Sequence, residues 1–126
     1  ERRKEIIKKY DEACDELGVI HLQHYGKDFA SSGHLYLTRI PGARDEQRRE
    51  IITKLAERGV NTNVHYKPLP MMTAYKNMGW DIKNFPNAYA YYENLITLPL
   101  HTKLSDEDVE YVTENFKAVV SAYTSK

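Results

Sequence analysis

The stretch from Gly59 to Pro70, which reads G-V-N-T-N-V-H-Y-K-P-L-P, constrains the fold of this chain most strongly. Gly59 is suited to end a helix, and we expect a short central strand over Asn61–Tyr66. The two prolines that follow cannot donate backbone hydrogen bonds, so a sheet ladder cannot continue through them. The strand end would therefore hold His65 and Tyr66 just before a rigid loop. Such a strand end can present side chains to a ligand, or it can serve only to turn a corner.

Two stretches before this point have apolar residues at the three- and four-residue spacing of amphipathic helices. The first is Arg2–Leu17, which Gly18 is suited to end. Its predicted buried stripe consists of Ile6, Ile7, Tyr10, Ala13, Cys14 and Leu17. The second is Arg44–Arg58, with acidic residues in its first turn and basic residues in its last, as the helix dipole favours. Its predicted buried edge consists of Ile51, Ile52, Leu55 and Ala56.

A third amphipathic helix is predicted to begin after Ser105, which forms a capping-box pattern with Asp108. Its apolar stripe consists of Val109, Val112, Phe116, Val119 and Val120. Shorter helices are predicted over Met71–Met78 and over Phe85–Asn94, where Pro86 falls in the first turn.

Two further strands are predicted, over Gly33–Ile40 and Leu95–Leu98, whereas Val19–Ser32 has the composition of a loop. In the first of these strands, Leu35 and Leu37 share one face. The opposite face carries His34, Tyr36 and Thr38. The order of elements indicates a single two-layer α+β domain over residues 1–126, with helices packed on one face of a short, mostly antiparallel sheet.

The composition excludes several classes of protein. The 126 residues are 41% hydrophobic and 29% charged, which suits one globular domain. The 18 basic and 18 acidic residues balance, and no basic stripe indicates a nucleic-acid partner. No apolar run approaches the roughly 18 residues that a membrane helix needs. Cys14 is the only cysteine, so we expect a buried thiol, no internal disulfide and a cytoplasmic protein.

Three blocks of sequence carry a family resemblance. They are S-S-G-H-L-Y-L-T-R-I at 31–40, G-V-N-T-N-V-H-Y-K-P-L at 59–69, and N-A-Y-A-Y-Y-E-N-L-I-T-L-P-L-H-T-K-L-S-D-E-D-V-E-Y-V at 87–112. In order and spacing they resemble the C-terminal region of the DegT/DnrJ/EryC1/StrS family of pyridoxal-phosphate-dependent aminotransferases. Residues 1–18 correspond to the end of that family's linking helix. The chain departs from the family pattern at Pro70, where many members have His, and at Thr97, where many have Ser.

The resemblance implies a fold-type I aminotransferase that works as a homodimer on nucleotide-linked keto-sugars, with glutamate as the amino donor. Products of such enzymes are amino sugars for surface polysaccharides, lipopolysaccharide or antibiotics. It also implies that the lysine, the acid and the phosphate-binding residues that hold pyridoxal phosphate (PLP) lie in a larger N-terminal domain. The chain does not begin with Met, which fits a processed chain or an excised fragment. We therefore expect this chain to be the C-terminal small domain alone, with no cofactor, no catalytic residue and no activity of its own.

The resemblance implies that His65 and Tyr66 lie close to the sugar-nucleotide substrate. An imidazole and a phenol can both donate hydrogen bonds to hydroxyl or phosphate oxygens. The alternative is a buried pair with backbone partners. His34 is the next candidate for substrate binding, with Tyr36 beside it, on a sheet face turned toward the missing domain. Their alternative is ordinary packing with one hydrogen bond.

Other residues have weaker signals. His21 and His24 have a spacing that zinc sites use, but no acid or cysteine cluster supplies further ligands, so no metal site is expected. Arg39 would need a partner if it is buried. A solvated helix face is the expected position of three further arginines, Arg44, Arg48 and Arg49. The aromatic stretch Tyr75, Trp80, Tyr89, Tyr91 and Tyr92 fits either an interface or a local core.

Two functions from different classes therefore remain open at the level of the sequence. One is the small domain of a sugar aminotransferase, whose partners would be the missing domain and the second subunit of a homodimer. The other is a freestanding α+β module that binds a ligand or a protein. A nucleic-acid-binding module is disfavoured by the neutral charge.

Overall fold

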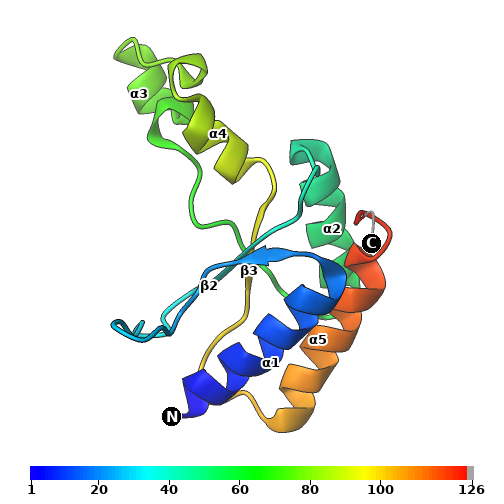
Figure 1. The fold of residues 1–126 in the computed structure, drawn as a ribbon. Helices are drawn as coiled ribbons and strands as arrows, with labels where there is room; N and C mark the ends of the chain where they lie inside the picture. Colours follow the sequence, from blue (N-terminus) through cyan, green and yellow to red (C-terminus); the bar gives the residue numbers. More distant parts are fainter. Residues whose placement is uncertain (125–126) are drawn as a thin grey trace.

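Helices cover one face of a small sheet, and a helical arm projects from the far end of that sheet (Figure 1). The computed structural model describes residues 1–124. The helices are α1 (Arg2–Leu17), α2 (Asp45–Glu57), α3 (Thr73–Asn77), α4 (Pro86–Tyr92) and α5 (Asp106–Val120), with short 3-10 turns at Leu69–Met71 and Ile82–Asn84. The strands are β1 (Ile20–His21), β2 (Tyr36–Arg39) and β3 (Leu95–Leu98). The predicted two-layer α+β fold is confirmed.

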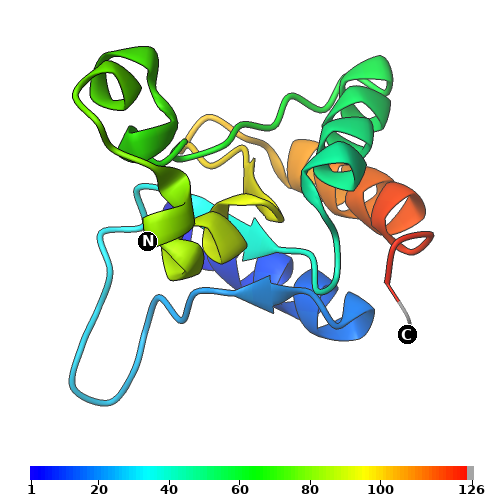
Figure 2. The same cartoon turned by 90° about the horizontal axis from the view of Figure 1, so that it is seen from above.

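The three strands form one antiparallel sheet in the order β1-β2-β3. In the register of the central pair, Tyr36 lies opposite Leu98 and Arg39 opposite Leu95. Strand β1 was not expected, because two residues within a loop-like sequence are too short to show an alternating pattern. The loop that follows it, residues 22–35, extends away from the sheet, as Figure 2 shows in light blue.

The predicted central strand over Asn61–Tyr66 is wrong. This segment runs beside the outer edge of β3 and pairs with it through a single bridge, between Asn63 and Thr97. One reason is local: the Asn63 side chain accepts a hydrogen bond of 2.7 Å from the backbone N–H of Val64. A side chain that binds its neighbour's backbone competes with a sheet ladder, and the prolines beyond it stop the ladder from resuming.

The main core lies between the sheet and helices α1, α2 and α5. Every residue of the predicted α1 and α5 stripes is buried, including Cys14. In α2, Ile51 and Leu55 are buried as predicted, whereas Ala56 is exposed because it falls on the solvent side of the helix. The glycine after α1, Gly18, adopts the left-handed conformation with φ 69°, which confirms the predicted helix end.

Tyr36 faces this core, so the expectation that it lies on the opposite, substrate-facing side of the sheet is wrong. Its ring is fully buried, 5.1 Å from the ring of Tyr10. Its hydroxyl donates a hydrogen bond of 2.6 Å to Asp11. Burial raises the pKa of this phenol above its ordinary value. The packing alternative, with one principal hydrogen bond, therefore describes Tyr36.

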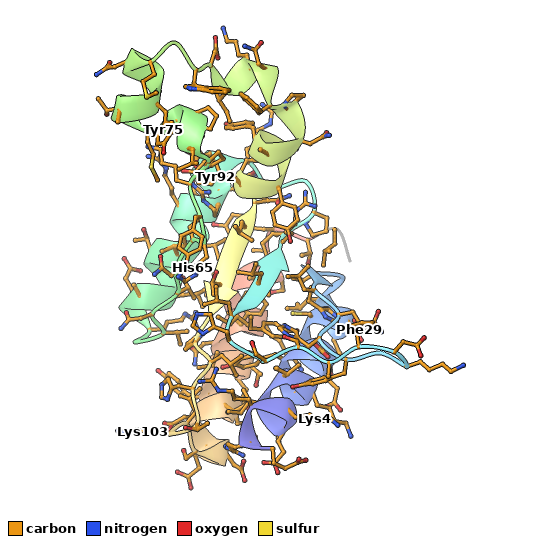
Figure 3. All side chains as sticks on the ribbon, turned by 90° about the vertical axis from the view of Figure 1, so that its left-hand side faces the viewer. Lys4, Phe29, His65, Tyr75, Tyr92 and Lys103 are labelled. Atoms are coloured by element: carbon orange, nitrogen blue, oxygen red, sulfur yellow. The ribbon has the colours of Figure 1, made fainter. Side chains whose placement is uncertain are left out.

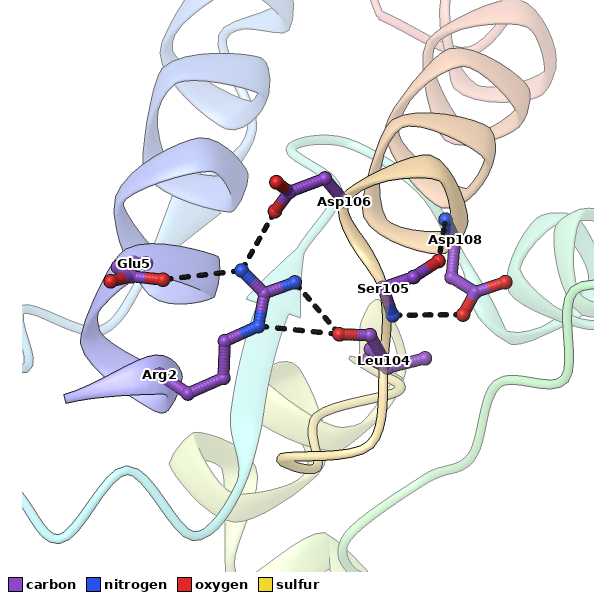
Figure 4. Close-up of polar contacts among 6 residues, drawn as sticks. All are labelled: Arg2, Glu5, Leu104, Ser105, Asp106 and Asp108. Atoms are coloured by element: carbon purple, nitrogen blue, oxygen red, sulfur yellow. Dashed lines mark hydrogen bonds and ion pairs between the residues drawn. The ribbon is translucent and has the colours of Figure 1, made fainter.

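The N-terminal ends of α1 and α5 are joined by a polar cluster (Figure 4). Arg2 donates to Asp106 at 2.7 Å and to the carbonyl of Leu104 at 3.2 and 2.7 Å. Ser105 and Asp108 form the predicted capping box, with bonds of 2.9 and 3.0 Å. The pKa of Asp106 is lowered by its bond to Arg2, and that of Asp108 by its bonds to Ser105. These hydrogen bonds thus hold the first turns of α1 and α5 together.

We call residues 68–92 the arm, and α1, α2, α5 and the sheet the body. The arm holds α3, α4 and the two 3-10 turns, and Figure 1 shows it extending beyond the sheet. The predicted short helices are confirmed, with Pro86 at the start of α4. None of the residues of the main core cluster comes from the arm. No helix among residues 1–124 is long and apolar enough to span a membrane.

Candidate functional site

The segment that carries His65 is fastened to β3 through Thr97. The backbone N–H of Asn63 donates to the carbonyl of Thr97 at 3.1 Å, and the N–H of Thr97 donates back at 2.7 Å. Two residues further on, the Nδ1 atom of His65 lies 3.0 Å from the hydroxyl of Thr97. His65 therefore lies over the sheet face that the helices leave free, at mid-height in Figure 3.

Beside this contact is an open hollow of about 260 Å³. It brings His34, two residues before β2, together with His65. Its remaining lining residues come from the segment before His65, from β3 and from its exit: Asn61, Thr62, Asn63, Thr97, Leu98, Pro99 and Leu100, with Leu35 beside His34. The two predicted site histidines therefore share one hollow, although they are 31 positions apart in the sequence.

Tyr66 does not line the hollow. Its side chain is 68% exposed, and its ring meets the His65 ring edge-on with the centroids 4.7 Å apart. A ring this exposed is free to stack on a ligand that sits above His65, or to pack against another chain segment.

The polar groups of the hollow are imidazole, amide, hydroxyl and backbone groups. None of the described residues that line it is Asp, Glu, Lys or Arg. The hydroxyl of Thr62 is buried without a hydrogen-bond partner in the described part of the chain. Imidazole, amide and hydroxyl groups together can donate to and accept from a polyhydroxylated ligand. The hollow thus suits a polyhydroxylated ligand such as a sugar.

The hollow does not fit PLP. That cofactor is held through a lysine amine, and no lysine within residues 1–124 lines the hollow. No step of cofactor chemistry can therefore be assigned to the residues described.

Two arginines join the arm to the body. The side chain of Arg48 lies almost wholly inside the protein, donates to the carbonyl of Tyr92 at 2.6 Å, pairs with Asp45, and stacks over the Tyr92 ring at 4.2 Å. The expectation that Arg48 lies on a solvated face is wrong, because the end of α4 covers this side of α2. Arg39 has the partners its position requires: Asn94 at 3.0 Å and the carbonyl of Ala90 at 3.1 Å.

The arm carries an apolar groove of about 350 Å³. It is lined by Pro68, Leu69, Pro70, Tyr75, Trp80, Phe85 and Ala88. Trp80 and Tyr75 remain 49% and 36% exposed, whereas Tyr92 is buried at the base of the arm. The aromatic stretch is thus divided: its end forms a local core around Arg48, and its outer part is an open apolar surface.

His21, in β1, and His24, in the loop that follows it, do not line the hollow. His21 bridges Asp11 and Asp15 at 3.1 and 3.0 Å. His24 is buried, stacks on Tyr36 at 5.5 Å between ring centroids, and contacts the Ser31 hydroxyl at 3.0 Å. Burial lowers the pKa of His24. Across residues 1–124, no group of three or more His, Cys, Asp or Glu side chains could hold a metal ion.

Comparison with known proteins identifies the family. The chain belongs to the DegT/DnrJ/EryC1/StrS aminotransferase family, whose pattern matches residues 1–117. The solved structure of the proposed sugar aminotransferase Spr1654 from Streptococcus pneumoniae, in its PLP form, is 52% identical. It superposes with a TM-score of 0.93 over 98% of this chain and 32% of its own.

Two curated relatives are also similar. The spore coat polysaccharide biosynthesis protein SpsC of Bacillus subtilis is 32% identical over 94% of this chain and 31% of its own length. The dTDP-3-amino-3,6-dideoxy-alpha-D-galactopyranose transaminase of Aneurinibacillus thermoaerophilus is 30% identical over 90% of this chain and 30% of its own length. The chain thus spans about a third of the length of the relatives it matches.

Proposed function

We propose that this chain is the C-terminal small domain of a PLP-dependent aminotransferase that converts a nucleotide-linked keto-sugar to an amino sugar, with glutamate as amino donor. The observation that carries the proposal is the hydrogen-bonding hollow that brings His34 and His65 together in a chain of this family. The relative that bears the name of a dTDP-amino-sugar transaminase supports a nucleotide-sugar substrate.

In this proposal His65, Tyr66 and His34 bind and orient the sugar nucleotide. The two histidines offer ring nitrogens to hydroxyl or phosphate oxygens, and the exposed ring of Tyr66 stacks above His65. Proton transfers at the cofactor belong to groups outside this chain. The effect of these residues should therefore fall on substrate binding rather than on the chemical step.

The cofactor and the partners lie in the rest of the parent enzyme. PLP, when bound there, supplies the electron sink for amino transfer. We propose that the N-terminal domain and the second subunit of a cytoplasmic homodimer complete the site, and that they cover the apolar groove of the arm. This chain alone should bind no PLP: borohydride treatment after incubation with PLP should leave no single lysine specifically modified.

The test is His65→Ala in the parent enzyme, with His101→Ala, an exposed histidine outside the hollow, as the matched control. A lost hydrogen bond costs about 0.5–1.5 kcal/mol to a neutral group and about 1.5–3 to a charged one. We expect the KM for the keto-sugar to rise roughly tenfold, within that range. The half-reaction with glutamate should change much less. Unchanged sugar kinetics, or equal damage to the glutamate half-reaction, would return His65 to a structural role.

A further inference from the structure

Thr97 has an unusual position for a hydroxyl group. It lies within β3, the strand Leu95–Leu98, whose four residues are all buried. Successive strand residues point to opposite faces, so Ile96 and Leu98 enter the main core while Thr97 points to the other face. Its side chain is only 5% exposed, in the middle of the face that the helices leave free.

The hydroxyl of Thr97 has one described hydrogen-bond partner, the Nδ1 atom of His65 at 3.0 Å. A buried hydroxyl hydrogen without an acceptor costs free energy. A hydroxyl oxygen has two lone pairs, and leaving one of them without a donor costs less. The hydroxyl should therefore donate to Nδ1. In the neutral ring, the proton then resides on Nε2.

The second ring nitrogen, Nε2, has no hydrogen-bond partner among residues 1–124 and is not among the buried unpartnered atoms. Because the ring lines the hollow, this nitrogen is available to a ligand there as an N–H donor. The two backbone bonds between Asn63 and Thr97 hold the segment so that the side-chain bond sets the ring's direction.

We propose that Thr97 is a positioning residue: its hydroxyl fixes the orientation and tautomer of His65, so that Nε2–H is presented to the substrate. The part of this inference that concerns substrate rests on the proposed function. The hydrogen bond between the Thr97 hydroxyl and Nδ1 of His65, which we call the tether, does not. The sequence pattern indicates only that Thr97 lies in a strand. The proposed role follows from the bridge between Asn63 and Thr97, which brings His65 next to the hydroxyl.

Two substitutions separate the hydroxyl from the packing of the side chain. Thr97→Val removes the hydroxyl and keeps the branched shape. Thr97→Ser keeps the hydroxyl and removes a methyl group. The first readout is nitrogen NMR of this chain labelled with 15N-histidine, in which five histidines give a countable set of signals. His65→Gln assigns the signal of interest, and a urea titration shows that each variant is folded.

We expect His65 to be in the Nε2–H form at neutral pH, with an Nδ1 shift typical of a hydrogen-bond acceptor, in the wild type and in Thr97→Ser. In Thr97→Val the acceptor signature should disappear and the two tautomers should mix. An unchanged His65 spectrum in Thr97→Val would overturn the proposal. So would loss of the signature in Thr97→Ser with retention in Thr97→Val, because packing would then be the cause.

The second readout is the parent enzyme's kinetics. Thr97→Val should raise the KM for the keto-sugar about three- to tenfold, the range expected for one weakened neutral hydrogen bond, with kcat nearly unchanged. Thr97→Ser should remain near wild type. If the NMR tether is present but neither His65→Ala nor Thr97→Val changes sugar kinetics, the proposed function fails while the tether stands. If only Thr97→Val has no kinetic effect, the positioning role is refuted.

Discussion

The body and the arm both contain many large apolar side chains but use them differently. In the body, most of these side chains point into one core shared by α1, α2, α5 and the sheet, whereas Ile20 and Tyr111 are exposed. In the arm, five of them stay at least 36% exposed: Leu69, Met72, Tyr75, Met78 and Trp80. Apolar patches of this kind usually mark a surface that something else covers. The body thus has a core of its own, whereas the arm leaves an apolar surface open, as expected if the rest of the proposed parent enzyme covers it.

The strongest test of this comparison is to remove one phenylalanine from each region. Phe116→Ala empties a fully buried position in the core and should cost about 3–5 kcal/mol of unfolding free energy. Phe85→Ala in the arm removes a partly exposed ring that packs on Trp80 at 5.7 Å between centroids, and should cost clearly less. Urea titrations of both variants give the two values. Equal costs would show that arm and body share one core.

The next largest effect is expected at the junction between the two regions. Arg48→Ala leaves the carbonyl of Tyr92 without its charged donor, so the unfolding free energy should fall by about 1.5–3 kcal/mol. Arg49→Ala is the matched control, because Arg49 pairs with the same Asp45 at 2.9 Å but its side chain is 71% exposed. An exposed pair contributes about 0–1 kcal/mol. Equal effects in urea titrations would contradict the buried junction.

A smaller effect is expected from pH in the body. Burial lowers the pKa of His24 in the folded chain, while Asp11 opposes this shift and His21 adds to it. Its other facing groups, the Tyr36 ring and the Ser31 hydroxyl, are neutral near pH 7. The unfolded chain, with a histidine pKa of about 6.5, therefore binds the proton more readily below that pH. The contribution of His24 to the free energy of unfolding should be fully present well above pH 6.5, and the free energy of unfolding should decrease as the pH falls toward 5.

Urea midpoints measured between pH 7.5 and 5 check this sign. The decrease in the midpoint should be smaller in His24→Gln than in the wild type. In the exposed control His101→Gln the decrease should equal that of the wild type. If His24→Gln has the wild-type slope, protonation of His24 does not couple to folding.

Local signals were sufficient for much of the body. The capping box of Ser105 and Asp108 and the stripe that follows it predicted α5, since both depend only on neighbours in the sequence. The face on which Tyr36 lies was not predictable, because both faces of its strand carry mixed side chains. The choice between them depends on where α1 packs. Arg48 was misplaced for the same reason, since α4 covers it from 44 positions away.

Part of the lining of the hollow was also predictable from the sequence. His34 and His65 were indicated by the family motif, and the hollow brings them together. The positions of Thr62 and Thr97 beside these histidines were not indicated, because they depend on a single bridge beside β3, which gives no alternating pattern in the sequence.

Hydrogen–deuterium exchange read by mass spectrometry tests the difference between body and arm most directly. In this chain alone, amides of β3 and α5 should exchange only through global unfolding, whereas amides of the arm should exchange much faster through local opening. In the parent enzyme, the arm should become protected to a degree similar to that of the body. A single common exchange rate for arm and body in the chain alone would contradict the account, as would an arm that stays unprotected in the parent enzyme.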